Sequence, residues 1–433
     1  MYRSLWQETA GLPQFPTLCG NLTTDVLVIG GGMAGLLCLW HLRQAGISCA
    51  LVEAETICSG VTGHTTAKVT AQHGLVYHKI AKRYGLERAG LYLEANERAV
   101  ARYATLCSDM DCGWEQRPSY VYTADAPQAM AQELAVLKQL GYPAKRYTGL
   151  ALPVSATEAI RFDGQGQFHP LRFAAAIAEG LPIYEHTKVR RILPQKVITD
   201  HGTITAGDTI VATHFPILNR CGGYFMKQYQ YRSYVLALEG VPRLNGMYLE
   251  AKPNGLSFRS YDNLLLLGGG GHRTGAKGGG WSVVTEFAQC HWPQSRTVGR
   301  WATQDCITLD DLPYVGRYAR SVPHLYVATG FGKWGMTNAM TAGALLTDLV
   351  RGKSNPYEKL YSPMRSMLHP RIALNGLHAV GDLLRPTVPR CPHMGCALRY
   401  NRAEHTWDCP CHGSRFSRGG DLLDGPANED LQL

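Results

Sequence analysis

The first fifty residues alternate between strand and helix patterns. Residues 24–29 end in the apolar run VLVI and lead into glycine-rich sequence. Residues 36–44 then repeat apolar positions at helical spacing, and residues 49–53 form a second apolar run. Runs that are apolar on both faces are typical of buried strands in parallel sheets. The order strand, glycine turn, helix, strand therefore predicts an α/β fold with a parallel sheet.

The pattern changes in the middle of the chain. Residues 88–106 and 126–140 carry long helical repeats, whereas residues 234–238 and 264–268 have the composition of strands. These segments predict a second, mixed part of the fold beside the parallel sheet.

Composition places limits on the class of protein. A chain of 433 residues is long enough for two or three domains. Its net charge of +9 is modest, and no Lys/Arg block exceeds two residues, so we expect no nucleic-acid partner. The 47 glycines suggest that backbone repeatedly approaches another group closely, as it does around a nucleotide.

Cysteine usage and hydropathy indicate the compartment. Of 13 cysteines, four fall in two boxes near the C-terminus and the others are scattered, which favours a reducing environment. The first residues lack the apolar core of a secretory signal, and the longest apolar stretch, residues 26–40, is interrupted by glycines and too short to span a bilayer. We expect a cytoplasmic protein without a transmembrane segment.

The first glycine turn has the spacing of a dinucleotide-binding fingerprint. Gly30 permits a tight turn, Gly32 lets backbone reach a pyrophosphate, and Gly35 lets the helix pack on the strand. Glu53 ends the next strand, where an acid accepts hydrogen bonds from an adenosine ribose.

A second strand and glycine turn occur some three hundred residues later. Residues 325–329 lead into Gly330 and Gly332, and residues 338–350 form a helix of small side chains. Helix N-termini favour phosphate charge. Two such anchors suit a long ligand that is held at both ends, and this favours FAD over NAD.

Two Cys-plus-His pairs mark the C-terminal region. Cys391 and His393 form the first pair, and Cys409 and His412 form the second. Two thiolates and two neutral imidazoles can hold a [2Fe–2S] cluster with a potential of roughly −150 to +300 mV. A structural zinc site is the alternative, although zinc sites of that size usually pair Cys with Cys and His with His.

The two boxes, CPHMGC and CPCHGSRF, followed by Gly425-Pro426, closely resemble those of Rieske proteins. The resemblance implies that Cys391, His393, Cys409 and His412 are the cluster ligands. It also implies a disulfide between Cys396 and Cys411. Few strands precede the first box, so we expect a small, shortened all-β Rieske domain.

The glycine turns, with Asp311 to Gly316 in the sequence DLPYVG, resemble FAD-dependent oxidoreductases of the D-amino-acid oxidase and glycine oxidase type. More narrowly, the chain resembles members of that family with a C-terminal Rieske domain. The resemblance implies an FAD-binding Rossmann-like fold and a mixed-sheet substrate part. We expect the following residues to bind FAD: Gly30, Gly32, Met33, Ala34, Gly35, Glu53, Ser59, Gly60, Thr62, Val189, Thr213, Gly330, Gly332, Gly335, Met336 and Thr337.

The resemblance also implies a discontinuous domain organisation. We expect an FAD-dependent oxidoreductase in residues 1–354, a linker in 355–388 and the Rieske domain in 389–433. Within the oxidoreductase, we expect the FAD part in about 20–75, 170–215 and 300–352, and the substrate part in about 76–169 and 216–299.

The expected activity is oxidation of a small amine or amino acid at a C–N bond. Electrons would pass from FAD through the cluster to an external acceptor that the sequence does not identify. Family members hold a substrate carboxylate with arginine, which makes Arg259, His272 and Arg273 the candidates here. His64, Lys68 and His73 could lie near the flavin, and Cys306 is a weak candidate for covalent flavin attachment.

Three other functions stay open. The chain could be an electron-transfer flavo-iron-sulfur protein that a partner reduces, without a small-molecule substrate of its own. It could be a Rieske oxygenase, with His73 and His78 as ligands of a mononuclear iron, although the expected acid is replaced by Thr70. It could also sense redox state through Cys396 and Cys411.

Overall fold

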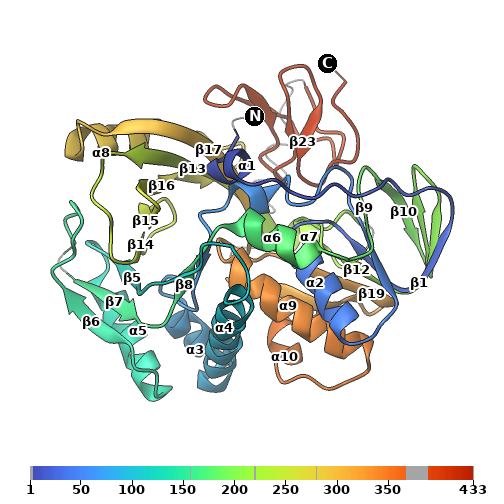
Figure 1. The fold of residues 1–433 in the computed structure, drawn as a ribbon, viewed down its shortest axis with the longest axis horizontal. Coiled ribbons are helices and arrows are strands. Elements are labelled where there is room, and N and C mark those ends of the chain that lie inside the picture. The colour runs from blue at the N-terminus through green and yellow to red at the C-terminus, as the bar shows by residue number, and fades with distance from the viewer. Residues whose placement is uncertain (1–2, 157, 219–220, 279, 367–388, 433) are drawn as a thin grey trace.

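A computed structural model describes residues 3–156, 158–218, 221–278, 280–366 and 389–432. The described chain forms a large body built on two eight-stranded sheets. A small four-stranded sheet lies on top of this body in Figure 1. No helix among these residues has both the length and the apolar character needed to cross a bilayer.

The first large sheet contains the predicted parallel strands. β1 pairs in parallel with β2 and β12, and β12 pairs in parallel with β19. Its strands are β1 (Leu22–Ile29), β2 (Cys49–Val52), β9 (Ile183–Tyr184), β10 (Val189–Leu193), β11 (Lys196–Thr199), β12 (Thr203–Val211), β18 (Tyr314–Ala319) and β19 (Val322–Thr329). The helices beside it are α2 (Met33–Gln44), α6 (Pro170–Ala178), α9 (Gly335–Val350) and α10 (Glu358–Tyr361).

The packing of α2 explains its even apolar composition. Leu36, Leu37 and Leu39 are fully buried, because the helix lies between the sheet and α9. A surface helix would show polar residues on one face, and this helix has almost none. α9 begins at Gly335, three residues before the range expected from the sequence.

The second large sheet is mixed, as predicted. β14 and β5 are parallel, whereas its other pairs are antiparallel. Its order is β17 (Arg296–Thr308), β13 (Gln228–Glu239), β16 (Leu264–Arg273), β15 (Ser257–Tyr261), β14 (Met247–Glu250), β5 (Ser119–Tyr122), β7 (Glu158–Phe162) and β6 (Lys145–Thr148). The helices α3 (Tyr77–Tyr84), α4 (Leu86–Cys107), α5 (Pro127–Gln139) and α8 (Ser282–His291) accompany it.

Short elements connect the two large sheets. They are α1 (Leu5–Thr9), η1 (Val61–His64), α7 (Tyr224–Lys227) and the three-stranded sheet of β3 (Lys68–Val69), β8 (Gly166–Gln167) and β4 (Glu115–Gln116). η1 contacts β17, α6 and α1. The segment after Glu53 therefore runs across the junction where a ligand between the two parts would lie.

The C-terminal sheet is antiparallel and its strands are short. It comprises β20 (Arg399–Asn401), β21 (Thr406–Asp408), β22 (Arg415–Phe416) and β23 (Leu422–Asp424). Residues 355–366, expected in the linker, pack on the large body: Tyr361 is fully buried, and Arg365 pairs with Asp310 at 2.6 Å. The rest of the expected linker, residues 367–388, lies outside the described residues.

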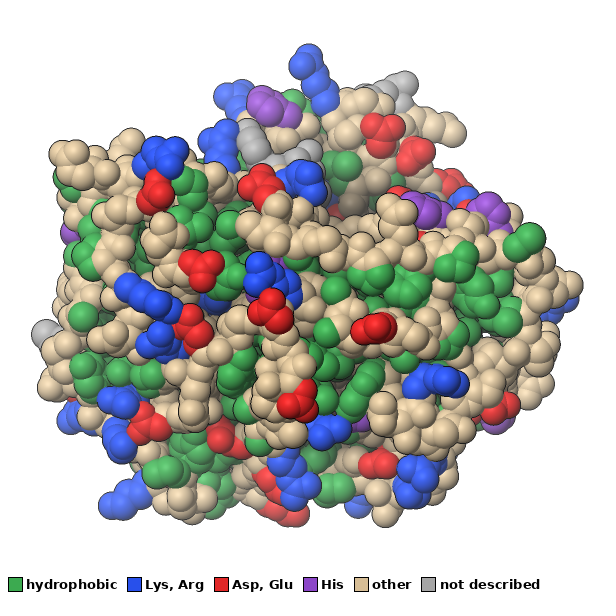
Figure 2. Space-filling model, viewed as in Figure 1, with side chains coloured by type: hydrophobic (Ala, Val, Ile, Leu, Met, Phe, Trp, Pro, Cys, Tyr) green, Lys and Arg blue, Asp and Glu red, His purple; other side chains and the backbone are tan. Residues whose placement is uncertain are grey.

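Charged side chains of both signs are mixed on the surface. In Figure 2, lysine and arginine side chains are interspersed with acidic ones over the visible face.

Candidate functional site

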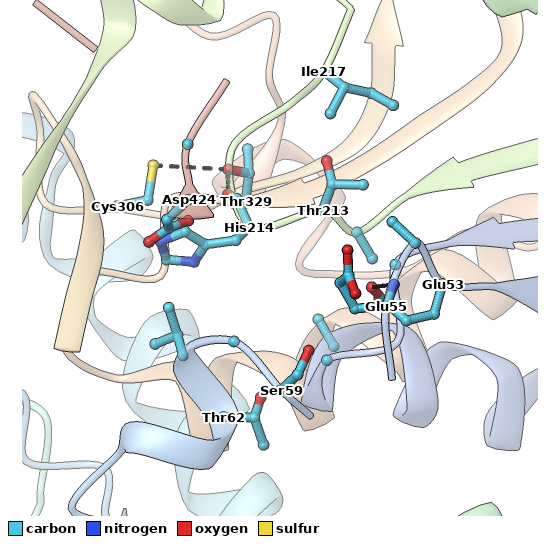
Figure 3. A pocket seen from close by; sticks show the side chains of 18 of the residues that line it. Glu53, Glu55, Ser59, Thr62, Thr213, His214, Ile217, Cys306, Thr329 and Asp424 are labelled. Atoms are coloured by element: carbon cyan, nitrogen blue, oxygen red, sulfur yellow. Dashed lines mark hydrogen bonds between the residues drawn. The ribbon is translucent and has the colours of Figure 1, made fainter. Parts of the chain in front are cut away.

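A cavity of about 590 Å³ lies where the parallel sheet, η1, β17 and the C-terminal sheet meet. Of the residues predicted to bind FAD, all but Gly35 and Thr337 line it. In Figure 3, Glu53 and Glu55 lie toward one side of the view, and Cys306, Thr329, His214 and Asp424 lie toward the other. The lining of the cavity includes both groups, as a ligand with two distant ends requires.

Two glycines of the first fingerprint, Gly30 and Gly35, have no room for a side chain. Gly30 has φ +107°, and a Cβ there would lie 2.7 Å from the carbonyl oxygen of Ala212. A Cβ on Gly35 would lie 1.8 Å from the carbonyl oxygen of Gly30. Gly35 therefore fixes how closely α2 approaches β1, which explains why it shapes the site without lining it.

Two helix N-termini face the cavity without side-chain caps. α2 starts after Gly32 and α9 starts after Trp334, and neither N-cap side chain accepts a helix N–H. Gly32 and Gly335 both line the cavity. The N–H of Met33 in α2 donates to the hydroxyl of Thr62 (3.0 Å), and other N–H groups of the first turns lack an intrahelical acceptor. The ends of these helices therefore suit the charged and polar atoms of a dinucleotide.

Glu53 is held in place by backbone. Its carboxylate accepts hydrogen bonds from the N–H groups of Gly31 (2.6 Å) and Glu55 (3.0 Å). Burial raises the pKa of Glu53, although these hydrogen bonds oppose the increase. The carboxylate lines the cavity in the position expected for a ribose partner.

Charged residues that the sequence did not single out lie at the other end. Asp305 and Lys333 both line the cavity. Burial raises the pKa of Asp305 and lowers that of Lys333, and in each case the charge of the other residue opposes the shift. The Lys333 ammonium donates to Pro253 O (2.8 Å) and lies 4.5 Å from the centre of the Tyr231 ring. Although protein surrounds it, Lys333 keeps accessible surface because it faces the cavity.

Cys306 also lines this end of the cavity. Its thiol donates to Gln228 Oε1 (2.9 Å), and burial raises its pKa to about 12. A protonated thiol is a poor nucleophile, so the environment of Cys306 does not favour covalent attachment of a flavin.

The three predicted substrate-binding residues do not line the cavity. Arg259 is fully buried, where its Nη1 donates to the carbonyl oxygens of Thr66 and Ala67, both at 2.7 Å. His272 bonds to the hydroxyl of Tyr234 (3.0 Å), and the guanidinium of Arg273 lies 5.0 Å from the Tyr229 ring. Only Nη1 of Arg259 is paired in this way: its Nε and Nη2 are buried without a hydrogen-bond partner among the described residues. The assignment of a catalytic role to these three residues stays a prediction.

The histidines and lysine after Glu53 have protein partners too. Lys68 donates to Tyr248 O (3.2 Å) and bonds to Ser257, and burial lowers its pKa to about 7. His73 bonds to Tyr92 (2.7 Å) and to the carbonyl of Thr70 (2.8 Å).

The same holds for His78, which pairs with Glu133 at 2.6 Å. His73 and His78 are thus committed to different partners. This arrangement does not favour a shared mononuclear iron.

The two Cys/His boxes converge in the C-terminal domain. Cys391, Cys409 and His412 are buried, and the rings of His393 and His412 lie 5.0 Å apart and nearly perpendicular. Hydrogen bonds close both loops: Cys391 N donates to Cys396 O (2.9 Å), and Gly413 N donates to Cys409 O (2.9 Å).

The buried atoms of these boxes fit a bound cluster. Both ring nitrogens of His393 and the Nδ1 of His412 lack a hydrogen-bond partner in the described part of the chain. Burial lowers the pKa of His393 to about 4 and of His412 to about 3, so both are neutral, the form that coordinates iron. Cys396 and Cys411 form a disulfide that joins the two loops.

The C-terminal domain itself forms part of the cavity wall. Asp424 and other residues of its last strand and the segment after it line the cavity beside the glycine turns; these residues are Leu422, Leu423, Asp424, Gly425, Ala427, Asn428 and Asp430. Sequence reasoning did not identify them, because nothing in a polar C-terminal segment indicates which surface it packs against.

Comparisons with known proteins agree with this architecture. The family model described as FAD dependent oxidoreductase matches residues 25–349, and the one described as Rieske [2Fe-2S] domain matches residues 379–433. The second match begins ten residues before the boundary expected from the sequence.

Two curated relatives and one solved structure illustrate the likeness. The chain is 33% identical to the Rieske 2Fe-2S iron-sulfur protein YhfW of Bacillus subtilis (strain 168), over 99% of this chain and 96% of that protein. It is 26% identical to gamma-glutamylputrescine oxidoreductase of Escherichia coli (strain K12), over 79% of this chain and 87% of that one. Glycine oxidase from Geobacillus kaustophilus superposes with a TM-score of 0.67 at 21% identity, over 80% of this chain and 100% of that one.

Proposed function

Because the chain belongs to the FAD-dependent oxidoreductase family and carries a Rieske [2Fe-2S] domain, we propose that it oxidises a small amine or amino acid at a C–N bond. We further propose that the electrons leave through the cluster to an external acceptor. The observation that carries this proposal is the shared wall, because residues of the Rieske domain line the flavin cavity.

The chain's own groups have separable roles in this proposal. FAD supplies a two-electron acceptor and the cluster a one-electron carrier. The glycine turns at Gly30 and Gly330 and the N-termini of α2 and α9 bind the dinucleotide, and Glu53 orients its ribose. Cys391, His393, Cys409 and His412 hold the cluster.

Asp305 and Lys333 support a charged substrate with an amino group. They present a carboxylate and an ammonium at one end of the cavity, close enough for each to oppose the pKa shift of the other. A zwitterionic amino acid, or an amine with a second polar end, can satisfy both charges. The relatives point the same way, since one is named for gamma-glutamylputrescine and a fold neighbour for glycine.

An anaerobic substrate screen tests the proposal. Amines and amino acids are added to the purified protein, and the flavin and cluster absorbance are followed. A true substrate bleaches the flavin first and the cluster afterwards.

Two outcomes would contradict the proposal. If only a reduced partner protein, and no small molecule, bleaches the flavin, the chain is an electron-transfer protein. If Cys409→Ser, which lacks a cluster ligand, turns over at the full rate with oxygen and forms peroxide, the cluster is not the exit for electrons.

A further inference from the structure

The second Cys/His box is seated on the flavin-binding body, whereas the first box lies nearer the surface. His412 is 4% exposed, and its ring packs edge-on against Phe225 at 5.7 Å. In the first box, His393 is partly exposed, although its ring nitrogens are buried, and its neighbours Pro392 and Met394 (44%) are exposed. The two histidines therefore differ in their surroundings: His412 faces the large body, and His393 lies on the less buried side of the domain.

Two glycines let the backbones of the two domains approach closely. A Cβ on Gly413 would lie 2.3 Å from the Gln230 side chain, and one on Gly275 would lie 2.6 Å from the backbone of Pro410. Both positions have positive φ, +83° and +74°. The loop from Cys409 to Gly413 is thus fitted to strand β13 and to the turn after β16 of the large body.

Gln304 connects this loop to the cavity. Its side chain is 1% exposed, and its Nε2 donates both to Gly413 O (2.9 Å) and to Asp424 Oδ2 (3.1 Å). The hydroxyl of Thr274 donates to its Oε1 (2.8 Å), which fixes the orientation of the amide. Gly413 directly follows His412, and Asp424 lines the flavin cavity.

The position of Gln304 in β17 completes the connection. The next two residues of the strand, Asp305 and Cys306, line the cavity. The buried amide of Gln304 thus connects three features. It lies beside the cavity wall, it bonds to the Asp424 carboxylate that the Rieske domain places in that wall, and it bonds to the carbonyl oxygen of the residue after His412.

We propose that Gln304 is a positioning residue that holds the His412 side of the Rieske domain against the flavin cavity, so that electrons pass from flavin to cluster within one chain on that side. This proposal rests on the proposed transfer of electrons between the two cofactors. Each flavin-to-cluster transfer moves one electron, which oxidises the flavin by one electron and reduces the cluster by one. His393 then faces the external one-electron acceptor.

Light-driven reduction of the flavin tests the proposal without a substrate. The holoprotein is illuminated anaerobically with EDTA as the electron donor, and the rate at which the cluster becomes reduced is followed by absorbance and by its electron paramagnetic resonance signal. Within one chain, this rate is independent of protein concentration. A rate that rises in proportion to concentration would overturn the proposal.

Substitutions at Gln304 supply the second arm. Gln304→Leu leaves Gly413 O and Asp424 without their buried donor, so the docked state is depopulated and we expect transfer to slow about tenfold or more. Gln304→Glu keeps the shape and the acceptor for Thr274 but removes the donor, and we expect the same direction. Thr297→Ala, on an exposed part of β17, is the matched control and should keep the wild-type rate.

Cofactor content separates positioning from folding. FAD and iron are quantified in every variant, and rates are compared among proteins that hold both. If Gln304→Leu does not accumulate with both cofactors, Gln304→Glu and the concentration series decide the outcome. Wild-type transfer rates in loaded Gln304 variants would overturn the proposal. Because light reduces the flavin, failure to find an amine substrate leaves this result unaffected.

Discussion

The flavin cavity and the cluster loops are built in contrasting ways. Backbone shapes the cavity at Gly30 and Gly35, where an added Cβ would meet a carbonyl oxygen. Side chains from two loops define the cluster site, where Cys409 and His412 converge on the first box. Added volume should therefore damage the flavin cavity, whereas loss of a single functional group should damage the cluster site.

The two regions also differ in how they are stabilised. The large body has an extensive apolar core that joins α2, α4 and α9 to both sheets. The buried cluster of the C-terminal domain contains Leu398, Phe416, Ala427, Leu431 and four cysteines. Since a core this small contributes little apolar burial, the C-terminal domain depends on its disulfide, its cluster and its contact with the large body.

A buried ion-pair network forms much of that contact. Glu404 accepts from Arg232 Nε (3.0 Å) on the large body and from Arg415 Nη2 (2.9 Å) in its own domain. Arg415 also pairs with Asp408 at 3.2 Å. Both arginines are at most 1% exposed, so loss of Glu404 would leave the buried charge of Arg232 without a carboxylate.

The largest expected effect comes from removing one cluster ligand. In Cys409→Ser we expect complete loss of the cluster, because serine does not replace the thiolate, while FAD is retained. Iron analysis, at roughly two per chain in the wild type, and the electron paramagnetic resonance signal measure this. Cys290→Ser, at an exposed position of α8, is the control and should keep its iron. Full iron in Cys409→Ser would show that this residue is not a ligand.

Added volume at the first glycine turn should have the next largest effect. In Gly35→Ala, the new Cβ lies 1.8 Å from Gly30 O, so α2 must move away from β1 and the dinucleotide cradle opens. We expect the bound FAD per chain to fall about tenfold or more. Gly11→Ala, where a Cβ meets nothing within 4 Å, should bind FAD normally. Normal FAD content in Gly35→Ala would contradict the role of backbone approach.

Breaking the ion-pair network should destabilise the contact between the domains. Glu404→Gln leaves Arg232 without its carboxylate and Arg415 with Asp408 alone, at an expected cost of about 3 kcal/mol in the free energy of unfolding. Urea unfolding of the holoprotein measures this. The exposed pair Glu239–Arg296 gives the control, since Glu239→Gln should cost less than about 1 kcal/mol. Equal costs for the two variants would contradict a special role for the buried network.

The same network sets a pH dependence. Burial alone would raise the pKa of Glu404, but Arg232 and Arg415 outweigh it and hold the pKa below its ordinary value of 4.5. Stability from this carboxylate is therefore full above pH 4.5 and is lost as the pH falls through the lowered pKa. Thermal unfolding at a series of pH values should show that wild type and Glu404→Gln converge at low pH.

The smallest expected effect concerns the substrate. If Lys333 receives a carboxylate, Lys333→Met should raise KM for acidic substrates about tenfold, near 1.4 kcal/mol, with less effect on kcat. Lys359→Met, on the exposed face of α10, should leave KM unchanged. An unchanged KM in Lys333→Met would mean that the substrate anion, if present, lies elsewhere.

Local signals accounted for what the sequence predicted well. The strand, glycine turn and helix around Gly30 lie within thirty residues, and each cluster box spans six residues or so. Chemistry that requires a fixed local spacing leaves a fixed local pattern. The two-part fold and both cofactors could therefore be predicted, and the family comparisons confirm them.

Contacts between distant segments left no such pattern. Asp305 and Lys333 reach the cavity only because β17 and the turn before α9 meet there. Arg259 is of the residue type that binds a substrate carboxylate. Its guanidinium nevertheless donates to the buried carbonyls of Thr66 and Ala67. A side chain's type shows which bonds it can make, whereas the tertiary fold decides which partner is within reach.

The Rieske segment in the cavity wall also constrains the order in which the protein matures in the cell. The ribosome completes the glycine turns of the large body before it makes Asp424, so the wall is missing while most of the chain folds. Once the domains dock, Cys409 and His412 are covered. We therefore expect iron–sulfur delivery to precede docking, and closure of the wall around FAD to come last.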